Sequence, residues 1–337
     1  MFQLKALVCS LLAVLALPHL ASGYANPGAC SGQCWTHDPA VVRRDDGVYF
    51  RFSTGSKIGI WKAPALEGPW TYQGAAIPAG SRINLPGRDD LWAPDVAKVG
   101  SQYIMYYSVS TFGSQNSAVG YATSPSMEFN SWTDRGATGL QSRPGNTYNA
   151  IDANYIQARG GTGERVLNFG SFWGGIHQVA LDGAGTQVGS GGAAPLGLQF
   201  QPAGTHASEG PFMFERQGWY YLFWSEGVCC GFDKNLPAPG AEYKIRVCRS
   251  QNFRGPFVDR NGVDCRNGGG TTVLESHGFV YGPGGQGIMT DPKKGTILYY
   301  REYFILSFPH LSAPRGRNEA LLFIGNEITD ALDRVLL

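Results

Sequence analysis

Four acidic side chains recur at a fixed interval along this chain of 337 residues. Each one lies 57 residues after the one before it, and the four are Asp38, Asp95, Asp152 and Glu209. When carboxyl groups meet in one pocket, a protonated one can donate a proton to a reacting group while an ionised one accepts a proton from water. The interval therefore predicts an acid–base site that a structural repeat brings together.

The segments between these acids also repeat. Short apolar and aromatic stretches recur in the same order, at 48–53 and 58–61, at 103–108 and 118–124, at 165–171 and 176–181, and at 219–225 and 243–250. Their length and their glycine, proline and aspartate borders are typical of strands. In a β-propeller, each blade begins with a strand beside the central channel, so the first residues of all blades face one funnel. The sequence predicts an all-β fold, a five-bladed β-propeller.

A fifth unit begins near His277 and continues to a strand at 296–300. Residues 301–337 lack the glycine and aromatic punctuation of the earlier units, so we expect the fifth blade to be incomplete or irregular. Two explanations stay open: an altered transcript end, such as a retained intron, and simple divergence of a peripheral segment. The expected organisation is a leader at 1–23, a propeller at 24–300 and a divergent C-terminal segment at 301–337 that completes or replaces the last blade.

The leader has the pattern of a secretory signal peptide. Lys5 precedes an apolar run over residues 6–17, and small residues follow at 21–23, which predicts cleavage after Gly23. A membrane anchor is the alternative, but the run is shorter than the roughly 18 apolar residues that a bilayer span needs. We therefore expect a secreted, extracellular protein with no membrane partner.

Composition favours one large domain. Glycine contributes 47 residues and aromatic side chains 12%, whereas only 16% of the residues are charged, which suits many short strands joined by tight turns. The formal net charge of +1 lacks the basic excess with which proteins neutralise nucleic-acid phosphates. We expect a monomer that binds a neutral ligand and no nucleic acid.

Cysteine usage agrees with an oxidising compartment. Six cysteines remain after the leader, and an even number favours disulfides. The pairing is not fixed by sequence, although Cys30 with Cys34 could staple the mature N-terminus. The other four fall within one repeat, at Cys229, Cys230, Cys248 and Cys265. A zinc site is disfavoured because no Cys/His pair at finger spacing completes it.

Five motifs occur in order along the chain. They are Cys34-Trp35-Thr36-His37-Asp38-Pro39, Leu91-Trp92-Ala93-Pro94-Asp95-Val96, Asn149-Ala150-Ile151-Asp152-Ala153, Gly170-Ser171-Phe172-Trp173-Gly174-Gly175-Ile176 and Ser208-Glu209-Gly210-Pro211-Phe212. Together they resemble the arabinanases of glycoside hydrolase family 43, most closely the secreted fungal endo-1,5-α-L-arabinanases. The resemblance covers about residues 24 to 300, and it implies the five-bladed propeller that the repeat also predicts.

The resemblance implies that Asp38 is the general base and Glu209 the general acid, with Asp152 as a third carboxylate that orients the acid and keeps its proton affinity high. Hydrolysis with inversion needs base and acid on opposite sides of the sugar, roughly 6.5–9.5 Å apart, so that a water molecule fits between them. Asp95 resembles no catalytic position, and we expect it to cap backbone amides in the channel.

Sugar binding needs flat apolar surface and convergent hydrogen-bonding groups. The resemblance places Trp92 and Phe112 at sugar subsites, and Trp173 is a further aromatic candidate. Asn149 and Ser171 are the polar candidates, since they lie in the matching motifs. Each aromatic could instead belong to the core, because aromatic residues are common throughout this chain.

The arabinanases of this family commonly hold a calcium ion in the central channel, with one histidine ligand in a Gly-Pro-Gly-His segment. The matching stretch here, 282–285, ends in glycine, so that ligand is absent. His277 lies shortly before it and is the candidate substitute, although a lone histidine is more often a hydrogen-bonded core residue and calcium prefers oxygen ligands. No organic cofactor is expected.

The predicted function is endo-acting, inverting cleavage of α-1,5 links in the arabinan side chains of pectin. Within the same family, an exo-acting arabinofuranosidase or β-xylosidase is the alternative, since loops at one end of the funnel decide the mode of attack. From another class, the chain could be a noncatalytic carbohydrate-binding propeller, or an enzyme disabled by its unusual tail. The intact acidic trio favours an enzyme.

Overall fold

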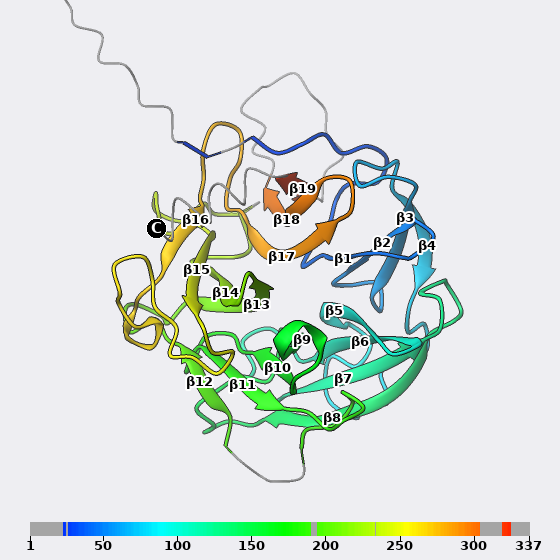
Figure 1. Ribbon diagram of the computed structural model, residues 1–337, viewed down its shortest axis with the longest axis horizontal. Coiled ribbons are helices and arrows are strands. Elements are labelled where there is room, and N and C mark those ends of the chain that lie inside the picture. Colours follow the sequence, from blue (N-terminus) through cyan, green and yellow to red (C-terminus); the bar gives the residue numbers. More distant parts are fainter. Residues whose placement is uncertain (1–22, 25, 190–193, 233, 304–318, 325–337) are drawn as a thin grey trace, which may run out of the picture.

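The computed structural model describes residues 23–24, 26–189, 194–232, 234–303 and 319–324 (Figure 1). The predicted signal peptide lies outside the described residues except for Gly23, and so does most of the segment 301–337. Among the described helices, none is long and apolar enough to cross a membrane.

The described strands form antiparallel sheets arranged around a common centre (Figure 1). Four sheets have four strands and one has three. In chain order the strands are β1 (Ala40–Arg43), β2 (Tyr49–Ser53), β3 (Gly59–Ala63) and β4 (Thr71–Ala75); β5 (Trp92–Val99), β6 (Gln102–Val109), β7 (Ser117–Ser124) and β8 (Thr133–Ser142); β9 (Asn154–Gln157), β10 (Arg165–Phe169), β11 (Ile176–Ala180) and β12 (Leu196–Gln199); β13 (Ser208–Arg216), β14 (Trp219–Glu226), β15 (Lys244–Ser250) and β16 (Thr271–Leu274); and β17 (Gly284–Asp291), β18 (Gly295–Tyr303) and β19 (Glu319–Ile324). Two short helical segments are α1 (Ala158–Gly161) and η1 (Cys265–Asn267). The fold is an all-β propeller.

The ring of sheets is closed. Each of β1, β5, β9 and β13 contacts the innermost strand of the following sheet, and β17 contacts β1. The three-stranded sheet therefore joins the fourth sheet to the first. β18 ends at Tyr303, beyond the predicted propeller end at residue 300, and β19 lies inside the segment expected to be divergent.

The alternation of side chains along each strand explains how a sheet packs against both of its neighbours, because successive side chains point to opposite faces. On β2, Phe50 and Phe52 pack with Met105 of the second sheet, whereas Tyr49 packs with Ile297 of the last sheet. Equivalent apolar clusters lie between the second and third, third and fourth, and fourth and last sheets. The core is thus a ring of five interfaces, and burial of apolar surface at each of them stabilises the closed fold.

The start of each innermost strand has a left-handed backbone residue, with φ of 44° to 59°: Asp38, Ala93, Asp152, Gly210 and Gly285. These residues are the structurally equivalent positions of the repeat. In the second, fourth and last sheets the strand pairing shifts register at this place, as in a β-bulge. Such turns re-aim side chains, and here they direct the heads of the innermost strands toward one central space.

This register changes the meaning of the 57-residue interval. Asp38 and Asp152 occupy equivalent positions, but Asp95 lies two residues after its equivalent position, Ala93, and Glu209 lies one residue before Gly210. The equal spacing of the four acids is therefore not a strict structural equivalence, because the blades differ in length. The repeat predicted the fold, and the local backbone decides where each carboxylate points.

Three disulfides are present in the described part of the chain. Cys30 pairs with Cys34, as the sequence suggested, and both pack against the aromatic cluster between the last and first sheets. Cys248 pairs with Cys265, which ties β15 to η1 within the core. The third bond joins Cys229 to Cys230, two adjacent residues.

Candidate active site

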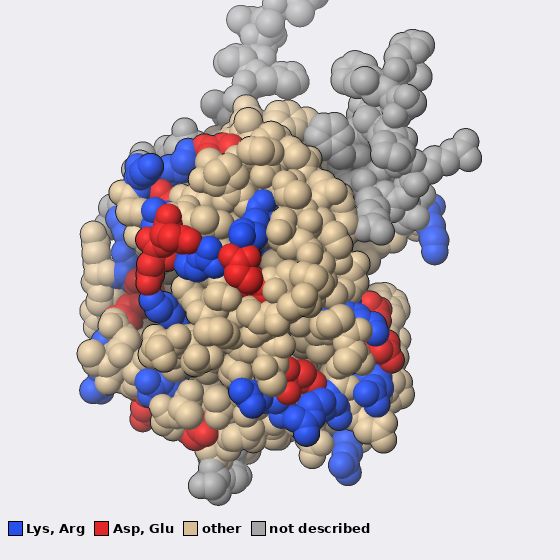
Figure 2. All heavy atoms as spheres, turned by 90° about the vertical axis from the view of Figure 1, so that its right-hand side faces the viewer, with Lys and Arg blue, Asp and Glu red and all other residues tan. Residues whose placement is uncertain are grey.

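A cavity of about 770 Å³ opens at the centre of the ring, and all five left-handed head residues line it. Its wall also includes the aromatic side chains Trp92, Phe112 and Trp173. Most of its lining is apolar, with a few convergent polar groups, as is usual for sites that bind small molecules. Outside the cavity, on the face shown in Figure 2, basic and acidic side chains lie close together rather than in a patch of one sign.

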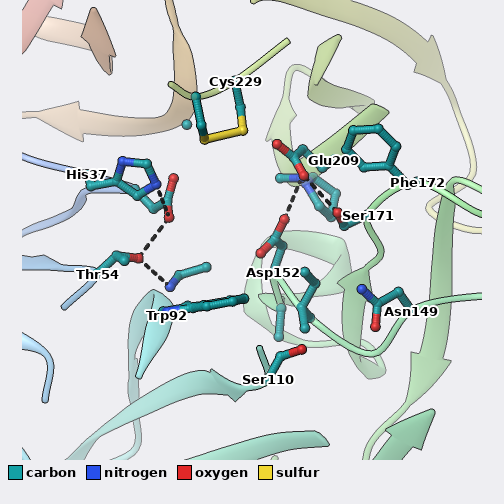
Figure 3. Close-up of a pocket in the computed structure, with 18 of the residues that line it drawn as sticks. His37, Thr54, Trp92, Ser110, Asn149, Asp152, Ser171, Phe172, Glu209 and Cys229 are labelled. Atoms are coloured by element: carbon teal, nitrogen blue, oxygen red, sulfur yellow. Dashed lines mark hydrogen bonds and ion pairs between the residues drawn. A yellow bond between two sulfur atoms is a disulfide. The ribbon is translucent and has the colours of Figure 1, made fainter. Parts of the chain in front are cut away.

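Asp38, Asp152 and Glu209 all line this cavity, although they lie at the heads of the first, third and fourth sheets. Figure 3 shows Asp152 and Glu209 on one side of it. Asp152 Oδ2 accepts a hydrogen bond of 3.1 Å from the Gly210 amide, which links the heads of the third and fourth sheets. Burial, followed by the charges of Glu209 and Asp38, raises the pKa of Asp152 well above its usual range. The three predicted carboxylates are therefore one electrostatically coupled group.

Two hydroxyl groups hold the Glu209 carboxylate. Ser171 Oγ donates to Oε2 at 2.7 Å, and the Tyr243 hydroxyl donates to Oε1 at 2.8 Å. Burial, and then the charge of Glu209, raises the pKa of Tyr243 well above its usual value, so this phenol stays a hydrogen-bond donor. Each oxygen of Glu209 thus has one fixed donor, which sets the orientation of the carboxyl plane.

Asp38 has different neighbours. Thr54 Oγ1 donates to Asp38 Oδ2 at 2.7 Å and accepts from the Ala93 amide at 2.7 Å, so it joins the heads of the first two sheets. His37 Nε2 lies 3.4 Å from Oδ2, and the buried Arg301 places its Nε 3.7 Å from Oδ1. Asp38 therefore has a histidine and an arginine beside it in addition to one hydroxyl donor, whereas Glu209 is held by two hydroxyl donors.

Asp95 has the capping role that the sequence predicts. Its Oδ2 accepts from the Tyr155 amide at 2.7 Å and faces Asn154 Nδ2 at 3.4 Å. One sheet further on, Asn154 Oδ1 accepts from the Met213 amide at 2.8 Å, in the same position relative to the left-handed residue. Burial raises the pKa of Asp95 to about 7, although these hydrogen bonds oppose the shift. Asp95 thus links two innermost strands.

The predicted aromatic subsite residues differ in exposure. Phe112 is 88% exposed and Trp173 is 37% exposed, so both offer open ring surface at the cavity, whereas Trp92 is half-buried. Phe172 and Trp173 both have left-handed backbones, with φ of 53° and 43°. Two consecutive non-glycine residues in this region are strained, and such strain is concentrated at functional sites. Trp173 lies in the cavity wall in this conformation.

The predicted polar subsite residues are both buried and both line the cavity. Asn149 Oδ1 accepts from Ser117 Oγ at 2.8 Å and from Ser142 Oγ at 3.3 Å, so its amide group is oriented by β7 and β8 of the second sheet. Ser171 donates to Glu209. The structure therefore places Ser171 as a support for the predicted acid, a contact that the motif alone did not indicate.

His277 is not one of the cavity-lining residues. Its Nδ1 lies 2.8 Å from the Glu275 carbonyl oxygen, and its ring lies 5.5 Å from that of Tyr24. This position does not suit a ligand in the channel. No group of three or more His, Cys, Asp or Glu that could hold a metal ion occurs in the described ranges, and calcium binding stays a prediction.

Sequence reasoning missed Thr54, Tyr243, Arg301 and the disulfide of Cys229 and Cys230, all of which line the cavity. Tyr243 ends a long loop between β14 and β15, and Arg301 lies in the segment expected to be divergent. Strand patterning marks which residues are extended, but it does not indicate which side chains reach a site assembled from other sheets. A signal in the sequence was the arginine directly after the aromatic pair Tyr299 and Tyr300 of β18.

A propeller whose axial cavity groups three carboxylates with exposed aromatic rings has the acid–base groups and the apolar surface that carbohydrate cleavage requires. Residues 32–319 match the sequence model of "Glycosyl hydrolases family 43", and the chain belongs to this family.

Relatives with named activities extend over most of the chain. It is 58% identical, over 84% of its length and 87% of the relative, to a "Probable arabinan endo-1,5-alpha-L-arabinosidase A" of Aspergillus fumigatus. It is 55% identical, over 86% of its length and 90% of the relative, to the "Arabinan endo-1,5-alpha-L-arabinosidase A" of Aspergillus niger. Among solved structures, the "GH43 Endo-Arabinanase from Bacillus licheniformis" superposes with a TM-score of 0.73 at 28% identity, covering 88% of this chain and 96% of that one.

Proposed function

We propose that this family 43 glycoside hydrolase cleaves internal α-1,5-L-arabinofuranosidic links of arabinan with inversion, using Asp38 as base and Glu209 as acid. The observation that carries the proposal is that these two residues, with Asp152, line one cavity from three different sheets. The substrate assignment is supported by the names and the high identity of the fungal relatives.

The reaction needs one proton at the leaving oxygen and the loss of one from water. Protonated Glu209 donates to the oxygen of the bond being cut, while Asp38 removes a proton from a water that attacks the anomeric carbon from the opposite side. The carbon–oxygen bond to the leaving sugar breaks, and the new bond to water forms with inverted configuration. Proton uptake by Glu209 and release from Asp38 then restore the starting state.

The residues around the trio support these roles. Ser171 and Tyr243 fix the carboxyl of Glu209, so that its proton is aimed at one place. Asp152 has a raised proton affinity and is coupled to both partners, so its charge state adjusts as protons move in the cavity. Trp92, Phe112 and Trp173 provide apolar surface for neighbouring sugar units, and Asn149 provides an oriented amide group.

The remaining predictions complete the proposal. The three-stranded sheet acts as the fifth blade, because it lies between the fourth sheet and the first in the closed ring. The protein is secreted after removal of residues 1–23, which rests on the N-terminal sequence pattern and the disulfides, and we expect it to be a monomer. Calcium in the channel stays a prediction without an identified ligand group among the described residues, and we expect no organic cofactor.

The test is incubation of purified mature protein with debranched linear arabinan, followed by product chromatography and viscometry. We expect mixed oligosaccharides and a rapid fall in viscosity, and loss of both in Glu209→Gln. The matched control is Asp95→Asn, which removes another cavity carboxylate without touching the proposed chemistry. Release of one small product from the outset would instead favour exo attack, and binding without cleavage would favour a noncatalytic propeller.

A further inference from the structure

The disulfide between Cys229 and Cys230 differs from the other two in its surroundings. Cys248 and Cys265 are fully buried in the core, and Cys30 and Cys34 pack on an aromatic cluster. The Cys229–Cys230 pair instead lines the central cavity, on a loop that follows β14. A covalent bond between adjacent residues closes almost no loop, so the usual gain from restricting the unfolded chain is small. Its position in the cavity wall is the feature to explain.

The disulfide lies close to the proposed base. The Cys229 carbonyl accepts a hydrogen bond of 3.2 Å from Arg301 Nη2, and the Nε of the same guanidinium is 3.7 Å from Asp38 Oδ1. The Arg301 guanidinium also lies over the ring of Tyr243, 5.2 Å from its centroid, and Tyr243 donates to Glu209. The buried Arg301 therefore connects the disulfide to Asp38 directly, and to Glu209 through Tyr243.

The view into the site gives the disulfide a definite place. In Figure 3 it lies between His37 and Glu209, on the opposite side from Trp92. All four residues line the same cavity. A sugar unit held between base and acid would therefore meet Trp92 on one side and the two sulfur atoms on the other.

The chemistry of a disulfide suits this place. Its sulfur atoms carry no proton, are polarisable and accept hydrogen bonds only weakly, so they present apolar surface that adapts to the C–H groups of a furanose. Because both side chains are locked in one ring, little rotational freedom is lost when a sugar packs against them. Two free thiols or two serines would keep more freedom and offer less fixed apolar surface.

We propose that the Cys229–Cys230 disulfide is a substrate-contacting wall of the cleft, which packs against an arabinofuranose unit at the cleavage point and keeps Arg301 beside Asp38. The inference rests on the proposed function, because it takes its ligand from the arabinan substrate. It assigns to this bond a binding role, whereas the other two disulfides support the fold.

A protection experiment tests the contact without relying on turnover. The Glu209→Gln variant is treated with a phosphine reductant and an alkylating reagent, with and without a saturating linear arabino-oligosaccharide, and the labelling of each cysteine is followed by mass spectrometry. We expect the sugar to slow labelling of Cys229 and Cys230 about fivefold or more. Cys30 and Cys34 are the matched control, since they are similarly half-buried but lie outside the cavity, and their labelling should not change. Equal labelling of Cys229 and Cys230 with and without sugar overturns the proposal.

Kinetics of cysteine variants provide the second measurement. In a Cys229→Ser/Cys230→Ser double variant we expect the KM for linear arabinan to rise about tenfold, with a smaller fall in kcat, and the Cys30→Ser/Cys34→Ser variant should keep the wild-type KM. An unchanged KM in a folded Cys229/Cys230 variant overturns the inference and leaves the proposed function standing. Failure of the wild type to cleave arabinan overturns the proposed function, and this inference with it.

Discussion

The heads of the second and fourth sheets each carry a carboxylate in the same cavity, yet the two carboxylates have opposite kinds of partner. Asp95 accepts from the backbone amide of the next innermost strand, so it joins two sheets. Glu209 accepts from two side-chain hydroxyls, so these hydrogen bonds do not tie its carboxylate to the backbone of a neighbouring strand. The difference follows from position: Glu209 precedes the left-handed residue of its strand, and Asp95 lies two residues beyond it, within the sheet.

The comparison shows that lining the central cavity does not by itself make a carboxylate catalytic. A carboxylate bonded to backbone amides has its lone pairs committed to the fold, whereas one held by hydroxyl groups can change its proton without loss of a strand contact. Asn154, which repeats the Asp95 contact with an amide group, supports this reading, because no charge is needed for that role.

The largest expected effect is on kcat, and it distinguishes the proposed catalytic base Asp38 from the structural carboxylate Asp95. Asp38→Asn should lower kcat on linear arabinan by about 10²- to 10⁴-fold, because water loses its proton acceptor. The measurement is initial-rate kinetics, with Asp95→Asn as control. If Asp38→Asn keeps more than about a tenth of the wild-type rate, or Asp95→Asn falls equally far, then the division into chemical and structural carboxylates is wrong.

The second prediction concerns the hydroxyl support of Glu209. Tyr243→Phe removes the donor at Oε1, and kcat should fall about 10-fold or more with little change in KM, because Glu209 becomes charged as it gives up its proton and a hydrogen bond to a charged group is worth roughly 1.5–3 kcal/mol. Ser171→Ala removes the donor at Oε2 and should act in the same direction. The double variant tests whether they share one function, because two donors that orient a single carboxyl should give a non-additive loss.

Much of this site could be predicted from the sequence, and the failures have a common cause. The repeat fixed the propeller and the motifs marked Asp38, Asp152 and Glu209, since these residues lie at strand heads where local pattern and position agree. Thr54, Tyr243 and Arg301 were missed because their contacts arise from packing between sheets. Arg301 reaches Asp38 across 263 positions of the chain, and no local periodicity carries that information.

The equal 57-residue spacing was itself partly accidental. Blades of unequal length place their left-handed residues at unequal intervals, so the even spacing of acids does not reflect an even spacing of strands. The last sheet has three described strands where the others have four, and the expected irregularity of the fifth blade stays a prediction. β17 contacts both β13 and β1, so the last sheet closes the ring, as the predicted propeller requires.

The third prediction addresses the aromatic wall opposite the disulfide. Trp92→Ala should raise KM for linear arabinan about 5- to 10-fold, with a smaller effect on kcat, because it removes apolar surface from binding rather than a group from proton transfer. Phe112→Ala should have the smaller effect of the two, since its ring is 88% exposed and has fewer fixed neighbours. Unchanged arabinan hydrolysis in Trp92→Ala would remove this residue from the substrate site.

The smallest effect falls on stability, and it tests the structural side of the contrast. The pKa of Asp95 is raised to about 7 in the folded protein, above its value of about 3.9 in an unfolded chain, so the folded state binds this proton more tightly. The stabilisation is complete below the unfolded pKa and is lost as the pH rises toward 7 and beyond. Asp95→Asn keeps an acceptor for the Tyr155 amide but cannot ionise, so it should remove this dependence. Relative to wild type, the variant should gain on the order of 2 kcal/mol between pH 5 and pH 8, discounted for the partial exposure of Asp95.

Thermal melts of both proteins across that pH range measure this difference, and the melting temperatures should diverge by a few degrees at the alkaline end. The buried carboxylates of the trio complicate the wild-type curve, but they are present in both proteins and cancel in the comparison. Parallel curves would mean that Asp95 is ionised in the folded state throughout, with its charge held by the Tyr155 and Asn154 contacts. In that case the second sheet would hold a true charge at the cavity, and the distinction from Glu209 would rest on hydrogen-bond partners alone.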